Sequence, residues 1–213
     1  MINTDIMSHQ EIKFMLQKYN LIKSLAKKKG ILRPRDLSEY NIHRQYLTRL
    51  CELGQLEKIG RGLYTLPNLE IDENLSLAQV SKSIPNSTIS LLSALRFHNL
   101  TTQLPFEVWI AIPNKAHQPS LTEISIRVVR FSGQALSAGI EEHLILGVKV
   151  PIYNPAKTIA DCFKYRYKIG IDVALEALRE GWQKHCCTLD DVWYYSKICR
   201  VTHVIKPYLE SLV

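Results

Sequence analysis

Hydrophobic residues in the first third of the chain follow the spacing of helices. From Gln10 to Lys29 they recur three and four positions apart, which predicts a helix that ends at Gly30. Pro34 suits the first turn of a second, shorter helix that runs to about Tyr40. The buried stripe of the first helix is expected to consist of Ile12, Met15, Leu16, Tyr19, Ile22 and Leu25.

A third helix is predicted from about His43 to Leu53, after a turn at Asn41 and Ile42. Two short helices joined by a tight turn make a helix-turn-helix. The apolar stripe of the third helix is expected to contain Ile42, Tyr46, Leu47, Leu50 and Leu53. Its opposite, polar face is expected to contain Arg44, Gln45, Thr48, Arg49 and Glu52.

Two short strands, "QLEKI" and "LYTLP", are predicted next, with Gly60-Arg61-Gly62 between them. Glycine permits the positive φ angles of a tight hairpin turn. A helix-turn-helix followed by a small hairpin is a winged helix, and Arg61 would lie at the tip of the wing. The strand residues expected to cover the underside of the helices are Leu56, Ile59, Leu63, Tyr64 and Leu66.

The polar, acidic segment 67–76 predicts a domain boundary after residue 70. The elements predicted beyond it are helices at 77–84 and 87–98, strands at 107–113, 124–131 and 143–153, and helices at 155–168, 171–183, 189–200 and the end of the chain. Gly147 indicates a bend or hairpin turn. Asn154 is predicted to be the N-cap of the helix at 155–168, and Thr188 with Asp191 is predicted to form a capping box for the helix at 189–200. The predicted fold class is α+β: a winged helix-turn-helix domain with an extended N-terminal helix (1–70), then a mixed α+β domain (71–213).

Composition and charge indicate the class of binding partner and the cellular compartment to expect. The 213 residues carry a net charge of +7, and residues 1–70 hold 12 Lys and Arg against 7 Asp and Glu. A basic first third predicts contact with a polyanion. No apolar run is long enough to span a membrane and no secretory signal is seen, so we expect a cytoplasmic protein. The five irregularly spaced cysteines are expected to be buried, reduced thiols.

The polar face of the third helix carries side chains suited to DNA. In winged helices this helix lies in the major groove and the wing touches the neighbouring backbone or minor groove. Arginine pairs bidentately with guanine, and glutamine with adenine. The candidate DNA-binding residues are Arg33, Arg35, His43, Arg44, Gln45, Thr48, Arg49, Lys58 and Arg61. The alternative is a solvated helix face, with the arginines paired to Glu52 or Glu57.

A second basic group lies in "KYRYK", where Lys164, Arg166 and Lys168 alternate with tyrosines. These cations indicate either a C-terminal basic surface for nucleic acid or a partner, or a solvated end of a helix.

Other chemistry is not predicted. His185, Cys186, Cys187, Cys199 and His203 lack a CxxC pair and match no common zinc module, so no metal site is expected. No GxSxG, HExxH or P-loop motif occurs, so we expect neither an enzyme nor a bound cofactor.

Three stretches, in this order, give the chain a recognisable profile: "LTRLCELGQLEKIGRGLYTLP", "TISLLSALRFHNLTTQLPFEVWIAIP" and "VPIYNPAKTIADCFKYRYKIGIDVALEALREGW". With them the chain resembles the AbiEi family of antitoxins from bacterial AbiE toxin–antitoxin and abortive-infection systems, which act in phage defence. The first stretch is a widespread type of wing, and the third is the most distinctive.

The resemblance implies a specific function. Members of the family have an N-terminal winged helix that binds operator DNA and represses their own operon. Their C-terminal domain counteracts a nucleotidyltransferase-like toxin encoded alongside, in type IV systems whose antitoxin need not form a stable complex with its toxin. The expected partners are therefore operator DNA, with inverted repeats, and such a toxin. The alternatives are an orphan winged-helix regulator and a protein-interaction module without antitoxin activity.

Overall fold

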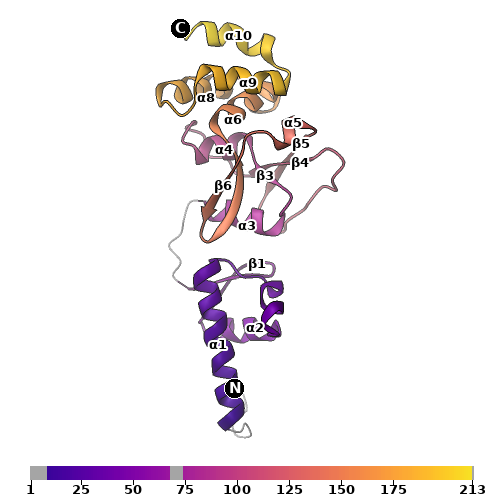
Figure 1. Cartoon of the computed structure of the whole chain (residues 1–213), viewed down its shortest axis with the longest axis vertical. Coiled ribbons are helices and arrows are strands. Elements are labelled where there is room, and N and C mark those ends of the chain that lie inside the picture. The colour runs from indigo at the N-terminus through magenta and orange to yellow at the C-terminus, as the bar shows by residue number, and fades with distance from the viewer. Residues whose placement is uncertain (1–8, 68–73, 213) are drawn as a thin grey trace. The chain divides into compact units, whose positions relative to one another are not determined.

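The computed structural model describes residues 9–67 and 74–212 and shows an α+β protein with two compact units (Figure 1). The first unit runs to Leu75 and takes in Leu146–Val148, while the second comprises Ser76–Ile145 and Lys149–Val213. The α+β class predicted from the sequence is confirmed. The expected boundary after residue 70 falls in 68–73, outside the described residues, and stays a prediction.

The first unit is a winged helix. Its elements are α1 (His9–Lys29), the 3₁₀ helix η1 (Pro34–Tyr40), α2 (Gln45–Glu52), β1 (Glu57–Gly60) and β2 (Leu63–Thr65). The second helix is therefore a 3₁₀ helix, and the third begins two residues later than expected, because His43 and Arg44 belong to the turn before it.

Among the described residues, the core of the first unit contains the buried hydrophobic side chains of Tyr19, Ile22, Leu25, Ala26, Leu32, Leu37, Ile42, Leu47, Leu50 and Leu56. Of the residues predicted to be buried, several are only half-buried and two, Leu16 and Leu53, are exposed. Leu16 is 51% exposed because it lies beside the stripe that Met15, Tyr19 and Ile22 direct toward this core. Leu53 is 49% exposed because α2 has already ended, which leaves it at the C-cap.

The second unit combines a five-stranded mixed sheet with helices. Its helices are α3 (Leu75–Ser83), α4 (Leu91–Phe97), α5 (Gln134–Ser137), α6 (Pro155–Lys164), α7 (Arg166–Ile169), α8 (Ile171–Gln183), α9 (Leu189–Cys199) and α10 (Thr202–Glu210). Its strands are β3 (Thr88–Ile89), β4 (Val108–Pro113), β5 (Ile126–Phe131), β6 (Ile140–Ile145) and β7 (Val148–Tyr153), in the order β5-β4-β3-β7-β6.

The prediction of a helix over residues 87–98 is wrong for its first residues. Thr88 and Ile89 form β3, the central strand of the sheet, and the helix starts only at Leu91. β3 runs antiparallel to β4 and parallel to β7, so strands on both sides fix its extended backbone. β4 and β5 pair in parallel over six residues, which also leaves β4 buried almost throughout.

The segment expected as one strand at 143–153 is a hairpin of β6 and β7. Leu146 and Gly147 form its turn, with φ angles of 48° and 72°. Two successive positive φ angles are typical of the tight turns that join antiparallel strands. The turn predicted at Gly147 is confirmed, and β6 begins earlier than expected, at Ile140.

Helix α6 is the centre of the helical layer. Every residue from 156 to 163 is buried, and α6, α8, α9 and α10 gather on one side of the sheet (Figure 1). The predicted N-cap is confirmed, since Asn154 Oδ1 accepts a hydrogen bond from the Lys157 N–H at 2.9 Å. The helix expected to reach residue 168 instead ends at Lys164, and α7 begins beyond Tyr165.

The predicted capping box of α9 is also confirmed. The Asp191 N–H donates to Thr188 Oγ1 at 3.0 Å, and the Asp191 carboxylate accepts from the Thr188 N–H at 3.1 Å. Of the helices that the structure describes, none has the length and apolar character required to cross a lipid bilayer.

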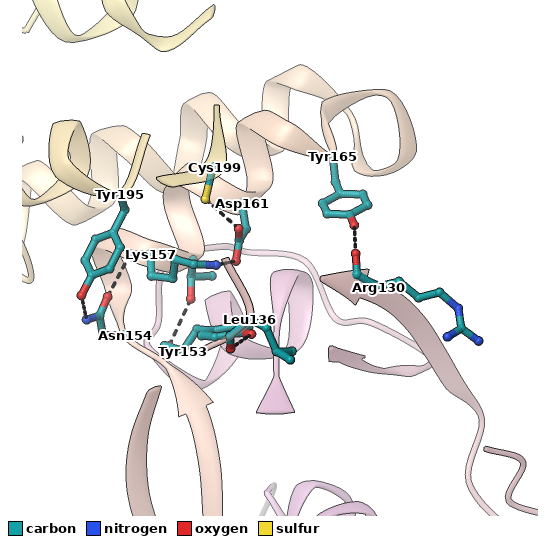
Figure 2. Close-up of polar contacts among 10 residues, drawn as sticks. Arg130, Leu136, Tyr153, Asn154, Lys157, Asp161, Tyr165, Tyr195 and Cys199 are labelled. Carbon is teal, nitrogen blue, oxygen red and sulfur yellow. Dashed lines mark hydrogen bonds and ion pairs between the residues drawn. The ribbon is translucent and has the colours of Figure 1, made fainter. Parts of the chain in front are cut away.

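A buried ion pair joins Lys157 to Asp161 on one face of α6 (Figure 2). Both side chains are fully buried, and the Cys199 thiol donates to Asp161 Oδ1 at 3.1 Å. Lys157 Nζ also lies 4.2 Å from the ring centroid of Tyr153. Burial raises the pKa of Asp161, and the ammonium of Lys157 opposes this shift. The ion pair therefore compensates two charges that would be costly to bury alone.

The five cysteines are free thiols, as expected. Cys162 and Cys199 are buried, and Cys51 and Cys187 are half-buried. Burial raises the pKa of Cys51, Cys162 and Cys199, and raises that of Cys187 to about 12. Cys186 is exposed, so the expectation of burial is wrong for this thiol.

Replacing Lys157 by methionine should lower the free energy of unfolding by about 3–5 kcal/mol, because a buried carboxylate loses its partner. Without the ammonium, the pKa of Asp161 in the folded state rises further above its unfolded value. The folded variant then binds a proton more readily than the unfolded chain, so its stability deficit should shrink as the pH is lowered from neutral. Urea denaturation at several pH values measures both effects.

Lys149→Met is the matched control, because Lys149 pairs with Glu142 on the surface at 2.8 Å. The pair is well exposed and screened by solvent, so its loss should cost far less stability than the loss of the buried pair. Equal losses for the two variants would contradict the role given to the buried pair.

Candidate nucleic-acid interface

The turn between η1 and α2 sets the direction of the third helix. Asn41 adopts a left-handed conformation (φ 50°), and its N–H bonds to the carbonyls of Leu37 and Ser38. Ile42 then enters the core, while His43 and Arg44 are exposed. The His43 ring Nδ1 accepts a hydrogen bond from the Gln45 N–H at 3.3 Å. His43 therefore stabilises the start of α2 rather than forming part of it.

Helix α2 separates its side chains between two faces. Leu47 and Leu50 are fully buried in the core of the first unit. Arg44, Gln45 and Thr48 are exposed on the other side. The polar face predicted from the sequence is thus open to solvent, because the apolar face alone attaches the helix to its core.

Arg49 is half-buried and belongs to a small group of aromatic and basic side chains. Its guanidinium lies 5.9 Å from the ring centroid of Tyr46, which packs edge-on against Tyr19 at 5.8 Å. Lys18 of α1 places its Nζ 5.1 Å from the same Tyr46 ring and 4.3 Å from Phe14. Such contacts hold long basic side chains close to an aromatic surface.

The sequence pattern did not indicate Lys18 as a member of this group. The stripe of α1 explains its apolar residues, and Lys18 lies between them with no motif to mark it. The i, i+4 spacing from Phe14 to Lys18 was the available signal, since such residues are neighbours on a helix.

The wing is a short antiparallel hairpin. β1 and β2 pair from Glu57–Thr65 to Gly60–Leu63, with an irregularity between Lys58 and Gly60. Gly62 has a φ angle of +70°, which favours glycine, and the turn consists of Arg61 and Gly62 rather than all three residues expected. Lys58 and Arg61 are exposed.

A third extended segment supports the wing. Leu32 forms an isolated antiparallel bridge with Tyr64, through N–H···O distances of 2.7 and 3.0 Å. The Thr65 hydroxyl donates to the carbonyl of Gly30 at 3.0 Å and is buried. These bonds fix the hairpin to the chain that leads into η1, a pairing that the sequence pattern did not show.

Two candidate phosphate contacts precede α2. Arg35 is exposed on η1, whereas Arg33 is half-buried at its N-cap. The Arg33 N–H donates to Asp36 Oδ2 at 2.8 Å, and Asp36 lies 3.8 Å from Lys29 Nζ. Together these contacts place basic residues around the start of η1.

The three cations of the predicted C-terminal basic surface have different surroundings. Arg166 donates to the Phe163 carbonyl at 2.9 Å and to the Tyr167 hydroxyl at 3.0 Å. Lys168 lies 5.5 Å from the Tyr165 ring. Lys164 instead lines a separate cavity.

The acidic and thiol residues do not assemble into a recognisable metal centre. Within the ranges 9–67 and 74–212, no group of three or more His, Cys, Asp or Glu side chains is placed to hold a metal ion. Asp161, the buried acid, is bonded to Lys157 and Cys199.

Residues 20–67 match the model of a family described as a transcriptional regulator, AbiEi antitoxin. The matched segment contains the second half of α1, the helix-turn-helix and the wing. No curated protein matches the chain. The resemblance inferred from the sequence is thereby confirmed over this segment, which is similar to the AbiEi antitoxin family of transcriptional regulators.

Proposed function

We propose that the chain is a sequence-specific DNA-binding autorepressor and the antitoxin of a type IV toxin–antitoxin system. The observation that carries the DNA-binding half is the exposed polar face of α2, which is followed in the chain by a wing with an exposed arginine. The family description supports the regulatory and antitoxin role in general terms.

The side chains divide into two kinds of contact. Arg44, Gln45, Thr48 and Arg49 lie on or beside α2, the element that would enter the major groove and meet base edges. Arg35, Lys58 and Arg61 lie outside α2, where contacts go mainly to phosphates. His43 and Arg33 complete the set, next to the starts of α2 and η1.

In this proposal, copies of the chain bind inverted repeats upstream of their own gene. The second unit counteracts a nucleotidyltransferase-like toxin encoded alongside, without the need for a stable complex. We place this activity in the cytoplasm, and it requires neither catalysis nor a cofactor.

A protein-interaction module is the second candidate, and one observation favours it. Phe14 and Leu21 on α1 lie seven residues apart, on one face of the helix, and are 57% and 37% exposed. Large apolar side chains close together on a surface often mark a contact with another protein. Tight, salt-insensitive capture of a protein, without any binding to DNA, would favour this candidate over the first.

Titration of the chain against a duplex from its own upstream region should show binding that weakens steeply with salt. The reason is that cations displace condensed counterions from the phosphates, so log K falls linearly with log salt, by about 0.9 for each phosphate neutralised. Fluorescence anisotropy at several salt concentrations measures the slope. Absence of binding at low salt would end the repressor proposal.

Arg44→Ala and Arg61→Ala should have different effects on specificity. Loss of Arg44 should cost about 1–3 kcal/mol on the operator and much less on a scrambled duplex, because a base contact is removed. Loss of Arg61 should weaken binding to both duplexes about equally and reduce the salt slope by about 1. Lys115→Ala, which removes an exposed charge from the second unit, is the control and should change neither. Identical profiles for Arg44→Ala and Arg61→Ala would contradict the assignment.

Repression and antitoxin activity should be separable. Co-expression of the chain with the adjacent toxin gene should restore growth, and Arg44→Ala/Arg49→Ala should retain this rescue while a reporter under the operon's promoter is derepressed. The reason is that both arginines belong to the first unit, whereas the antitoxin activity is assigned to the second. Loss of rescue by this variant at equal protein level would contradict the division of labour.

A further inference from the structure

A basic cavity in the second unit lies outside the proposed DNA interface. It has a volume of about 400 Å³ and is lined mainly by Ser132, Gly133, Gln134, Lys164, Lys197 and Arg200. Three of these residues are cations, and none of the residues that line the cavity is acidic. They come from the segment after β5, the end of α6 and the end of α9. The fold thus brings together charges that lie far apart in the sequence.

The charge of the cavity is not neutralised by the protein. In the described part of the chain, no ion pair links Lys164, Lys197 or Arg200 to Asp or Glu. Asp161 is buried nearby in α6, but it is already paired with Lys157. Three uncompensated cations around one cavity create a strong local potential for an anion.

Two of the cations are held by aromatic rings. Lys164 Nζ lies 5.3 Å from the ring centroid of Phe131, and Lys197 Nζ lies 5.7 Å from that of Trp193. These contacts restrict the long side chains while their ammonium groups keep their hydrogen-bond donors. Such restriction reduces the entropy lost when a ligand binds.

Arg200 occupies a backbone position that would suit glycine. It is the C-cap of α9 and has a left-handed conformation, with φ 59° and ψ 46°. Side chains other than glycine adopt this conformation at a cost. Local strain that is retained in a fold often coincides with a functional role for the side chain. Here the strained residue is the arginine that lines the basic cavity.

We propose that this cavity binds a small phosphorylated ligand through its phosphate or pyrophosphate group. Arginine and lysine form charge-assisted hydrogen bonds with phosphate oxygens, and Ser132 and Gln134 add neutral donors. A volume of about 400 Å³ is sufficient for an oligophosphate or a nucleotide. No aromatic side chain lines the cavity, so recognition rests on the phosphates rather than on stacking with a base.

A concave site favours a small ligand over a nucleic acid strand. Sites for single strands combine a charged groove that follows the backbone with aromatic platforms for successive bases. Here the cations converge on one cavity without such platforms. The inference does not depend on DNA binding by the winged helix, so Arg44→Ala should bind pyrophosphate as the unmodified chain does.

Calorimetric titration of the full chain with sodium pyrophosphate, and separately with ADP, in phosphate-free buffer tests the proposal. We expect saturable binding, with Kd increased about tenfold or more by Lys197→Gln and by Arg200→Gly, because each removes a charge-assisted contact. Lys115→Gln is the charge-matched control and should leave the affinity unchanged. Equal affinities for pyrophosphate and ADP would show that the cavity recognises the phosphates alone. Tighter binding of ADP would show that the ligand is a nucleotide.

Arg200→Gly separates binding from folding. Glycine accepts the left-handed conformation without strain, so the melting temperature should be unchanged or higher while the affinity falls. Failure of both ligands to bind at millimolar concentration would overturn the proposal. An equal loss of ligand affinity in Lys115→Gln would also overturn the proposal. So would a cavity variant that keeps its affinity for pyrophosphate and ADP but loses its affinity for DNA.

Discussion

The packing of α2 against the core of the first unit is the constraint on which the proposed interface depends. Leu47 and Leu50 enter a core built by Tyr19, Ile22 and Leu25 of α1, and this burial fixes which side of the short helix can meet solvent. A helix of eight residues is too short to be stable alone, so tertiary packing must supply its stability. The apolar contact therefore determines both that the helix forms and where its arginines point.

The local features of the first unit could be predicted from the sequence because they rest on neighbouring residues. These features are the spacing of apolar residues in the helices, Gly30 after α1 and the glycine in the wing turn. Each depends only on residues a few positions apart. Leu16 and Leu53 were placed wrongly because their exposure depends on where the core and the helix end. The bridge between Leu32 and Tyr64 was missed since it joins segments about thirty residues apart and needs only one residue from each.

In the second unit, too, features set by neighbouring residues could be predicted, whereas features set by long-range packing could not. The caps at Asn154 and Thr188 were predictable because side-chain oxygens in those positions bind the first N–H groups of a helix. Strand β3 was not, because its two residues sit inside an apolar run that also suits a helix, and only β4 and β7 decide the outcome. Likewise, Lys164 looked like part of a run with Arg166 and Lys168, whereas folding groups it with Lys197 and Arg200.

The unequal burial of the thiols has a practical consequence. The pKa of Cys51, Cys162, Cys187 and Cys199 is raised, so these thiols remain protonated and unreactive near neutral pH. Cys186 is the exposed one among the five. The natural chain therefore offers a single favoured attachment point for a maleimide dye, beyond the end of α8 and far in sequence from the winged helix. A fluorophore there could report on the protein without any engineered cysteine.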